Sequence, residues 1–124
     1  MSAARRYAGT RGSLSLESVL LLPLLAVIVA GLLQLTALLT DTLLVHEAAR
    51  AAVRVAATTS EDAAVVRAAT GAAPELVGLQ VTVTPSDRRS GDVVRVEASV
   101  VRTLGGVEHT LRASGHARVE PAVR

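Results

Sequence analysis

The sequence predicts an α+β protein with a long N-terminal helix, a short second helix and a small three-stranded antiparallel sheet. Three observations predict this fold class. An uncharged apolar stretch occupies residues 18–40, strong helix formers fill the residues after it, and the hydrophobic period changes to two after Val77. We therefore expect a basic head at residues 1–12, a long helix at 13–57 and a small α+β domain at 58–124.

The uncharged stretch has the length and composition of a membrane-spanning helix. It holds about 23 residues, and at about 1.5 Å per residue such a helix extends roughly 34 Å, enough to cross a bilayer core. It lacks the polar face of a soluble helix. Arg5, Arg6 and Arg11 precede it, whereas Asp41 and Glu47 are the first charges after it. The positive-inside tendency therefore predicts a single-pass protein of the cytoplasmic membrane, with a cytoplasmic N-terminus and an extracytoplasmic C-terminal domain.

A secretory signal is the main alternative for this segment. Apolar regions of signal peptides usually span about 7 to 15 residues and end at a small-residue cleavage site. Here the stretch is longer and ends in Thr40-Asp41-Thr42. Arg5-Arg6 suggests twin-arginine export, but the strongly apolar helix favours a retained anchor.

Two helical segments are expected after the apolar stretch. Residues 41–57 contain no Gly or Pro, so the first helix should continue beyond the bilayer as a stalk, with Glu47, Arg50 and Arg54 on one narrow stripe. Cap-type residues at 58–60 then predict a second helix over 61–70. Gly71 and Pro74 are expected to mark its end.

The C-terminal part alternates apolar and polar residues in three runs, 79–84, 94–100 and 110–119, which predict antiparallel strands. The connection at 85–92 is polar and rich in turn formers, and Gly105-Gly106 indicates a tight hairpin. A three-stranded sheet is marginal alone, so its apolar face needs a cover. The Ala-rich stretch 46–57 and the second helix are the candidates.

Composition argues against several classes of function. The chain has 13 basic residues, all arginine, and those beyond the head alternate with acids; with no Trp or Phe to stack bases, nucleic-acid binding is not expected. The sequence contains no nucleophile motif, phosphate loop or catalytic carboxylate pair, so we expect neither an enzyme nor a cofactor. His46, His109 and His116 are better explained as solvated than as metal ligands, because the last two should face opposite sides of a strand.

The residues at the start of the apolar helix carry a family resemblance. Arg11-Gly12, then Glu17 and then Pro23 inside an apolar helix resemble the type III signal of the type IV pilin superfamily. Together with Glu47-Ala-Ala-Arg50-Ala-Ala-Val-Arg54, this segment is similar to TadE-like minor pilins (pseudopilins) of tight-adherence secretion systems. Ser13 departs from the more apolar mature termini often found in pilins.

The resemblance implies a function in assembly of a pilus or secretion apparatus. A prepilin peptidase would cut between Gly12 and Ser13, remove the leader 1–12 and leave Ser13 as the new amino terminus. Glu17 would then pair with the terminal amine of a neighbouring subunit. The implied partners are the peptidase, other pilin or pseudopilin subunits, the membrane assembly platform and the bilayer, and the implied locations are the membrane and the pilus.

Other interpretations of these residues remain open. A charge at a membrane border is inexpensive, so Glu17 also fits an incidental boundary residue, and Pro23 fits a simple helix kink. At the level of the whole chain, the alternatives are an uncleaved single-pass protein with a small partner-binding domain, and an exported soluble module cut after the apolar helix.

Overall fold

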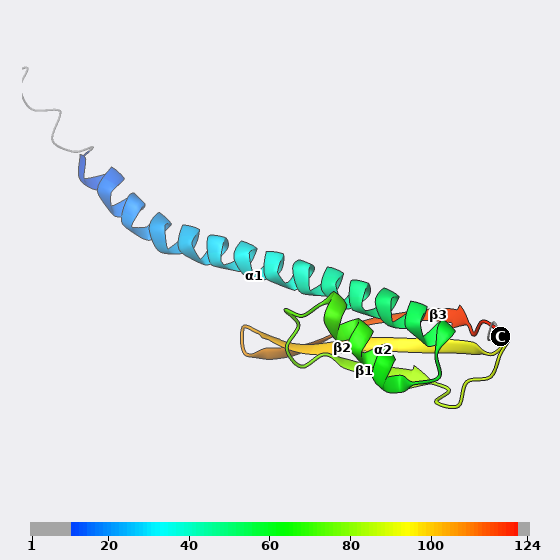
Figure 1. Ribbon diagram of the computed structural model, residues 1–124. Helices are drawn as coiled ribbons and strands as arrows, with labels where there is room; N and C mark the ends of the chain where they lie inside the picture. The colour runs from blue at the N-terminus through cyan, green and yellow to red at the C-terminus, as the bar shows by residue number, and fades with distance from the viewer. Residues whose placement is uncertain (1–10, 122–124) are drawn as a thin grey trace, which may run out of the picture. The chain divides into compact units, whose positions relative to one another are not determined.

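The computed structural model describes residues 11–121, with side chains from Glu17 onward, and confirms the predicted α+β class (Figure 1). The elements in chain order are α1 (Arg11–Thr58), α2 (Asp62–Ala72), β1 (Gln80–Thr84), β2 (Val93–Leu104) and β3 (Val107–Arg118). The chain forms two units, Met1–Ala37 and Leu38–Arg124. Helix α1 belongs to both, because its backbone is helical through residues 37 and 38.

Helix α1 is slightly longer than predicted. It begins at Arg11 and ends at Thr58, whereas the sequence predicts residues 13–57. Hydrogen bonds extend its last turn, since the Thr59 amide donates to the Val55 carbonyl over 3.0 Å and the Thr58 hydroxyl donates to the same oxygen over 3.1 Å. The stalk segment is therefore continuous with the apolar stretch.

The sheet has the order β1-β2-β3, and both pairs of neighbours are antiparallel. Strands β2 and β3 are longer than predicted, because their ladder continues to the Leu104–Val107 pair beside the turn. Gly105 and Gly106 have φ values of 57° and 81°. Positive φ at both central residues allows a two-residue turn whose twist matches that of the strands, so no longer loop interrupts the ladder.

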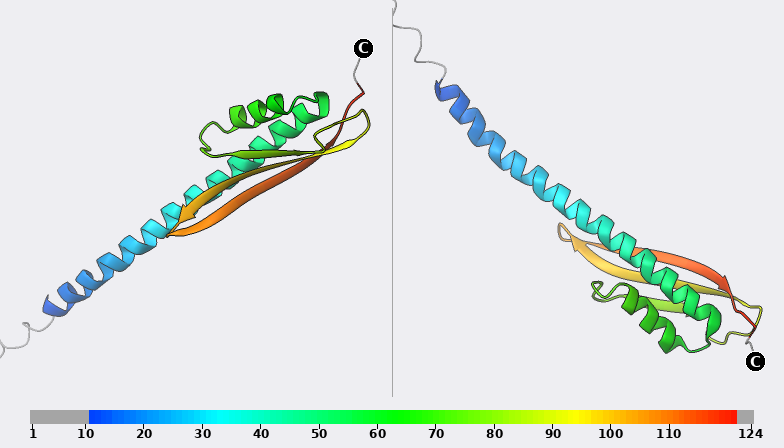
Figure 2. Two further views of the ribbon diagram at one scale, coloured as in Figure 1. Left: turned by 90° about the horizontal axis from the view of Figure 1, so that it is seen from below. Right: turned by 45° about the horizontal axis from the view of Figure 1, so that its top comes forward.

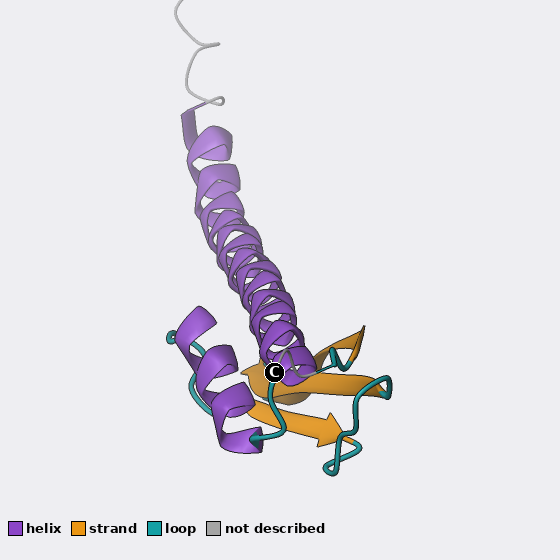
Figure 3. Ribbon diagram, turned by 45° about the vertical axis from the view of Figure 1, so that its right-hand side comes forward, coloured by secondary structure: helices purple, strands orange, loops and turns teal. Residues whose placement is uncertain are grey.

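One face of the sheet is covered by both helices, as the sequence predicts (Figures 2 and 3). Along β2, the even-numbered residues from Val94 to Val100 are buried and the odd-numbered ones are more exposed. The helices contribute mainly small side chains to this core: Val45, Ala48, Ala49, Ala52 and Ala56 from α1, and Val65 and Ala69 from α2. Small residues let the helical backbones approach the sheet closely.

Helix α1 and strand β3 approach each other closely at Gly115. A Cβ atom at that position would lie 2.6 Å from Val53 Cγ2, closer than real Cβ contacts allow. Glycine therefore lets Val53 occupy the space that a side chain on β3 would fill. The opposing residue on β2 is Val96, which is fully buried.

Helix α2 corrects two details of the sequence prediction. It begins at Asp62 and ends at Ala72, so Gly71 lies inside the helix; the Ala73 amide still donates to the Ala69 carbonyl over 3.2 Å. The capping residue is Glu61, whose side chain makes no capping hydrogen bond. Instead, the Thr59 hydroxyl oxygen accepts a hydrogen bond from the Glu61 amide over 3.2 Å.

Two contacts fix the end of the second unit that lies opposite the β2–β3 turn. Arg88, in the loop after β1, has a fully buried side chain whose Nη1 lies 2.8 Å from Asp62 Oδ1 at the start of α2. The residues after β3 return to α1, where the Glu120 amide donates to the Ala57 carbonyl over 2.9 Å. The loop after β1 is thereby joined to the start of α2, and the segment after β3 is joined to the end of α1.

Candidate functional site: the exposed apolar helix and its polar boundary

The apolar side chains of α1 between Val19 and Leu35 are exposed to the surroundings. Leu20, Val27 and Leu33 are 69%, 68% and 67% exposed. In water such exposure is unfavourable by about 25 cal/mol for each Å² of apolar surface. The helix is long and apolar enough to cross a membrane, where these side chains would meet lipid or another apolar helix.

Two threonines in and just after this stretch can be accommodated inside an apolar medium. The Thr36 hydroxyl donates to the Leu32 carbonyl over 2.9 Å, and the Thr42 hydroxyl near the end of the stretch donates to the Leu38 carbonyl over 2.8 Å. A hydroxyl that bonds one turn back along its own helix needs no water for its proton. Hence these threonines do not interrupt the apolar surface.

The predicted residues of the N-terminal signal lie along one helix. Gly12 and Ser13 are helical in backbone, but their side-chain environment and residues 1–10 of the leader lie outside the described residues. Glu17 is exposed and forms no ion pair within residues 17–121. Pro23 lies within α1, which continues on both sides of it.

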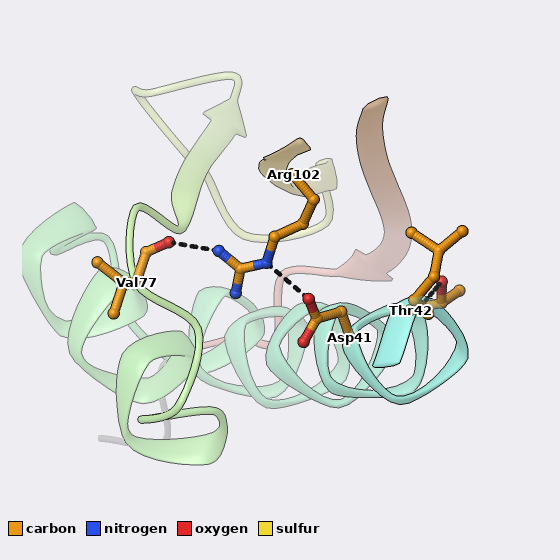
Figure 4. A network of polar contacts seen from close by, with 5 residues as sticks. Asp41, Thr42, Val77 and Arg102 are labelled. Atoms are coloured by element: carbon orange, nitrogen blue, oxygen red, sulfur yellow. Dashed lines mark hydrogen bonds and ion pairs between the residues drawn. The ribbon is translucent and has the colours of Figure 1, made fainter. Parts of the chain in front are cut away.

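A largely buried ion pair that the sequence did not predict lies just after the other end of the apolar stretch. Asp41 is the first charged residue after that stretch, and its Oδ2 accepts a hydrogen bond from Arg102 Nε over 2.6 Å (Figure 4). Arg102 Nη1 also donates to the Val77 carbonyl over 3.2 Å. Both charged side chains are about three-quarters buried. The pair therefore ties α1, β2 and the loop after α2 together at one point.

A signal for this contact was present in the alternation of β2. The inward positions Val94, Val96, Ala98 and Val100 are followed at the next inward position by Arg102. An arginine on the apolar face of a strand calls for a partner, because an uncompensated buried charge is costly. The register alone could have identified Arg102, but only the fold identifies Asp41 as its partner.

A groove of about 430 Å³ lies between α1 and β3. Its titratable and charged lining residues are His46, Arg50, Arg54 and His116, and Arg50 Nη1 lies 3.3 Å from Glu47 Oε1. The register of β3 contains no bulge, so His109 and His116 face opposite sides, which confirms the prediction. Among the described residues, no group of three or more His, Cys, Asp or Glu could hold a metal ion.

Comparison with known proteins adds no relative to this description. No protein-family model, curated protein or solved structure matches the chain.

Proposed function

We propose that the protein is a TadE-like minor pilin, or pseudopilin, processed after Gly12 and assembled in the membrane as part of a tight-adherence type pilus or secretion apparatus. The proposal rests on one observation above others. Glu17 stands at the start of an exposed apolar helix and has no ion-pair partner within residues 17–121. In a membrane, a carboxylate in that position would be stabilised by a cation from outside the described residues.

The new amine of Ser13 in a neighbouring subunit is a suitable cation. A free terminal amine is largely protonated at neutral pH. Pairing it with Glu17 would offset part of the cost of removing both charges from water, which for a single charge at a helix centre is about 2.5–3.5 kcal/mol. The amine exists only after cleavage, so processing and lateral assembly would be coupled.

The arrangement supports a single-pass topology in the cytoplasmic membrane. Arginines precede the apolar stretch, so the head would stay in the cytoplasm while the unit with the sheet folds outside. The exposed apolar side chains of α1 would then contact lipid first and neighbouring helices after assembly. The prepilin peptidase and the assembly platform complete the set of proposed partners.

Mass spectrometry of the membrane-bound product tests the proposal. Coexpression with an active prepilin peptidase should yield a chain that begins at Ser13, and Gly12→Leu should leave the leader attached. Gly31→Leu is the matched control, because a side chain at Gly31 meets nothing within 4 Å, and it should be processed normally. An intact N-terminus beside an active peptidase would refute the proposal.

The groove between α1 and β3 favours one alternative function. Its two arginines and two histidines suit an acidic partner, as expected for an uncleaved single-pass protein with a partner-binding domain. In that case Gly12→Leu would change neither the mass nor the location of the product. The same experiment therefore separates the two functions.

A further inference from the structure

Exposed apolar side chains of the second unit gather at the end that holds Asp41. Of the seven large apolar residues exposed within residues 38–121, five belong to the segments that meet at the Asp41–Arg102 pair or at the adjoining β2–β3 turn, and the other two are Val66 and Val93. Leu39 and Leu43 lie one position beyond the neighbours of Asp41 on α1 and point away from it, and Val101 lies on the sheet face opposite to that of Arg102. Val107 pairs with Leu104 next to the turn. Val77 is 80% exposed, and its carbonyl oxygen accepts a hydrogen bond from Arg102.

The opposite end of the sheet provides the comparison. Val93 is exposed there too, and its ladder partner is the charged residue Arg118. Along β2 it lies about 30 Å from Arg102 at about 3.3 Å per residue. Single exposed apolar residues of this kind are ordinary on protein surfaces. Five such side chains at one end of the unit, from α1, the loop after α2 and both strands, indicate that this end has an apolar partner.

Chain continuity identifies the partner as the bilayer surface. Thr40 ends the uncharged stretch and Asp41 follows it directly, so the Asp41–Arg102 pair lies at the membrane boundary when residues 18–40 span the bilayer. The β2–β3 turn is within a few residues of Arg102, and Val77 is bonded to it. These apolar side chains are therefore held where a bilayer changes from head groups to acyl chains.

We propose that the Asp41 end of the second unit contacts the bilayer directly, with Val77 and Val107 in the interfacial region. The inference rests on the proposed membrane insertion of residues 18–40. Arg102 makes the contact possible, because it neutralises Asp41, the first charge outside the apolar stretch, while its own side chain is only 26% exposed. The unit thereby has two attachments to the membrane, the helix and the turn.

The charges at this end predict which lipids matter. Glu75 and Glu108 carry exposed carboxylates close to Val77 and Val107, and Arg102 is already paired. Attraction of basic residues to anionic lipid, which acts through unpaired Lys or Arg, is therefore absent from this contact. Burial of apolar side chains alone holds the unit against the bilayer. The depth of Val77 and Val107 in the bilayer should therefore not increase when anionic lipid is added.

Single cysteines carrying an environment-sensitive fluorophore test the proposal, since the natural chain has no cysteine. The full chain would be placed at one copy per nanodisc of zwitterionic lipid. The label at Val107→Cys should show blue-shifted emission, quenching by lipids with a spin label near the head group, and loss of quenching by aqueous iodide. Val93→Cys is the matched control, because Val93 and Val107 are 57% and 58% exposed. Its label should stay open to iodide.

A third label separates failure of this proposal from failure of membrane insertion. Ile28→Cys lies within the apolar stretch and should be quenched by lipids labelled deep in the acyl chains. If Ile28 is protected by lipid while Val107 is as open to iodide as Val93, the bilayer contact is wrong although the helix spans. If Val107 is shielded from iodide but not quenched by labelled lipid, protein covers it and the proposal is likewise overturned. Greater depth with anionic lipid would contradict the charge argument.

Discussion

At the scale of single residues, the buried arginines are the main departures from an apolar core. Arg88 and Arg102 each pair with one carboxylate, but their surroundings differ. Arg102 also donates to a backbone carbonyl, whereas the fully buried guanidinium of Arg88 has only the Asp62 ion pair within the described residues. Asp62 is half exposed. Removal of that one carboxylate would leave the charge of Arg88 without compensation.

We expect Asp62→Asn to lower the free energy of unfolding of the full chain by about 1–3 kcal/mol, less than for a fully buried pair because Asp62 is partly solvated. Arg88→Met should be less harmful, because it removes the charge together with its unpaired donors. Thermal unfolding in detergent, followed by circular dichroism, measures both. Glu61→Gln is the control, since its pair with Arg67 is exposed and should change stability by under about 0.5 kcal/mol. Equal effects of Asp62→Asn and Glu61→Gln would contradict this account.

At the scale of elements, the packing of α1 on β3 depends on the absence of a side chain at Gly115. Val53 presents its Cγ2 methyl group to that point, and a β-branched side chain has little freedom to move aside. The contact joins segments that lie far apart in the sequence. It fixes the distance between the stalk helix and the edge of the sheet.

Gly115→Ala should destabilise the full chain by about 1–3 kcal/mol through overpacking. The double substitution Gly115→Ala, Val53→Ala should recover part of that loss, because it removes the clashing methyl groups. Gly71→Ala is the matched control: nothing lies within 4 Å of its added carbon, and in a helix the change should be neutral or stabilising by up to about 1 kcal/mol. Thermal melts of the natural chain and of these three variants measure the effects. The absence of recovery in the double variant would refute the steric explanation.

Sequence patterns were sufficient to predict the elements, because periodicity and turn chemistry are local. The period of two located β2 and β3, and Gly105-Gly106 located their turn. The Asp41–Arg102 pair and the Gly115–Val53 approach were missed, since both depend on how elements meet. Their signals, an arginine and a glycine at inward strand positions, show that a partner is required but not which one. The pilin assignment of Gly12, Glu17 and Pro23 remains a proposal based on spacing.

At the scale of the whole molecule, the two units have different sources of stability. The second unit buries its own core, whereas the apolar side chains of the first are exposed throughout its described span and, under the proposed membrane insertion, would be surrounded by lipid. Backbone hydrogen bonds in such a medium have no water to replace them. The backbone hydrogen bonds of the two parts of α1 should therefore break under different conditions.

Hydrogen exchange of the full chain in nanodiscs should show this difference. Amides between Val19 and Ala37 should stay protected when mild denaturant exposes the second unit, whereas amides of β2 should exchange together as that unit unfolds. The amides between Val19 and Ala37 should exchange faster when the bilayer is replaced by a short-chain detergent. Loss of protection in both regions at the same denaturant concentration would indicate one cooperative unit instead.

The hydrogen bond from the Glu120 amide to the Ala57 carbonyl has a mechanical consequence. With the Asp41–Arg102 pair, it fastens the outer part of α1 to the sheet near both ends of that segment. A tensile force applied along α1 would therefore be transmitted to β2 and β3 in the direction of the strands. Ladder bonds lie across the strands, so such a tensile load strains many of them at once in shear instead of opening them one after another.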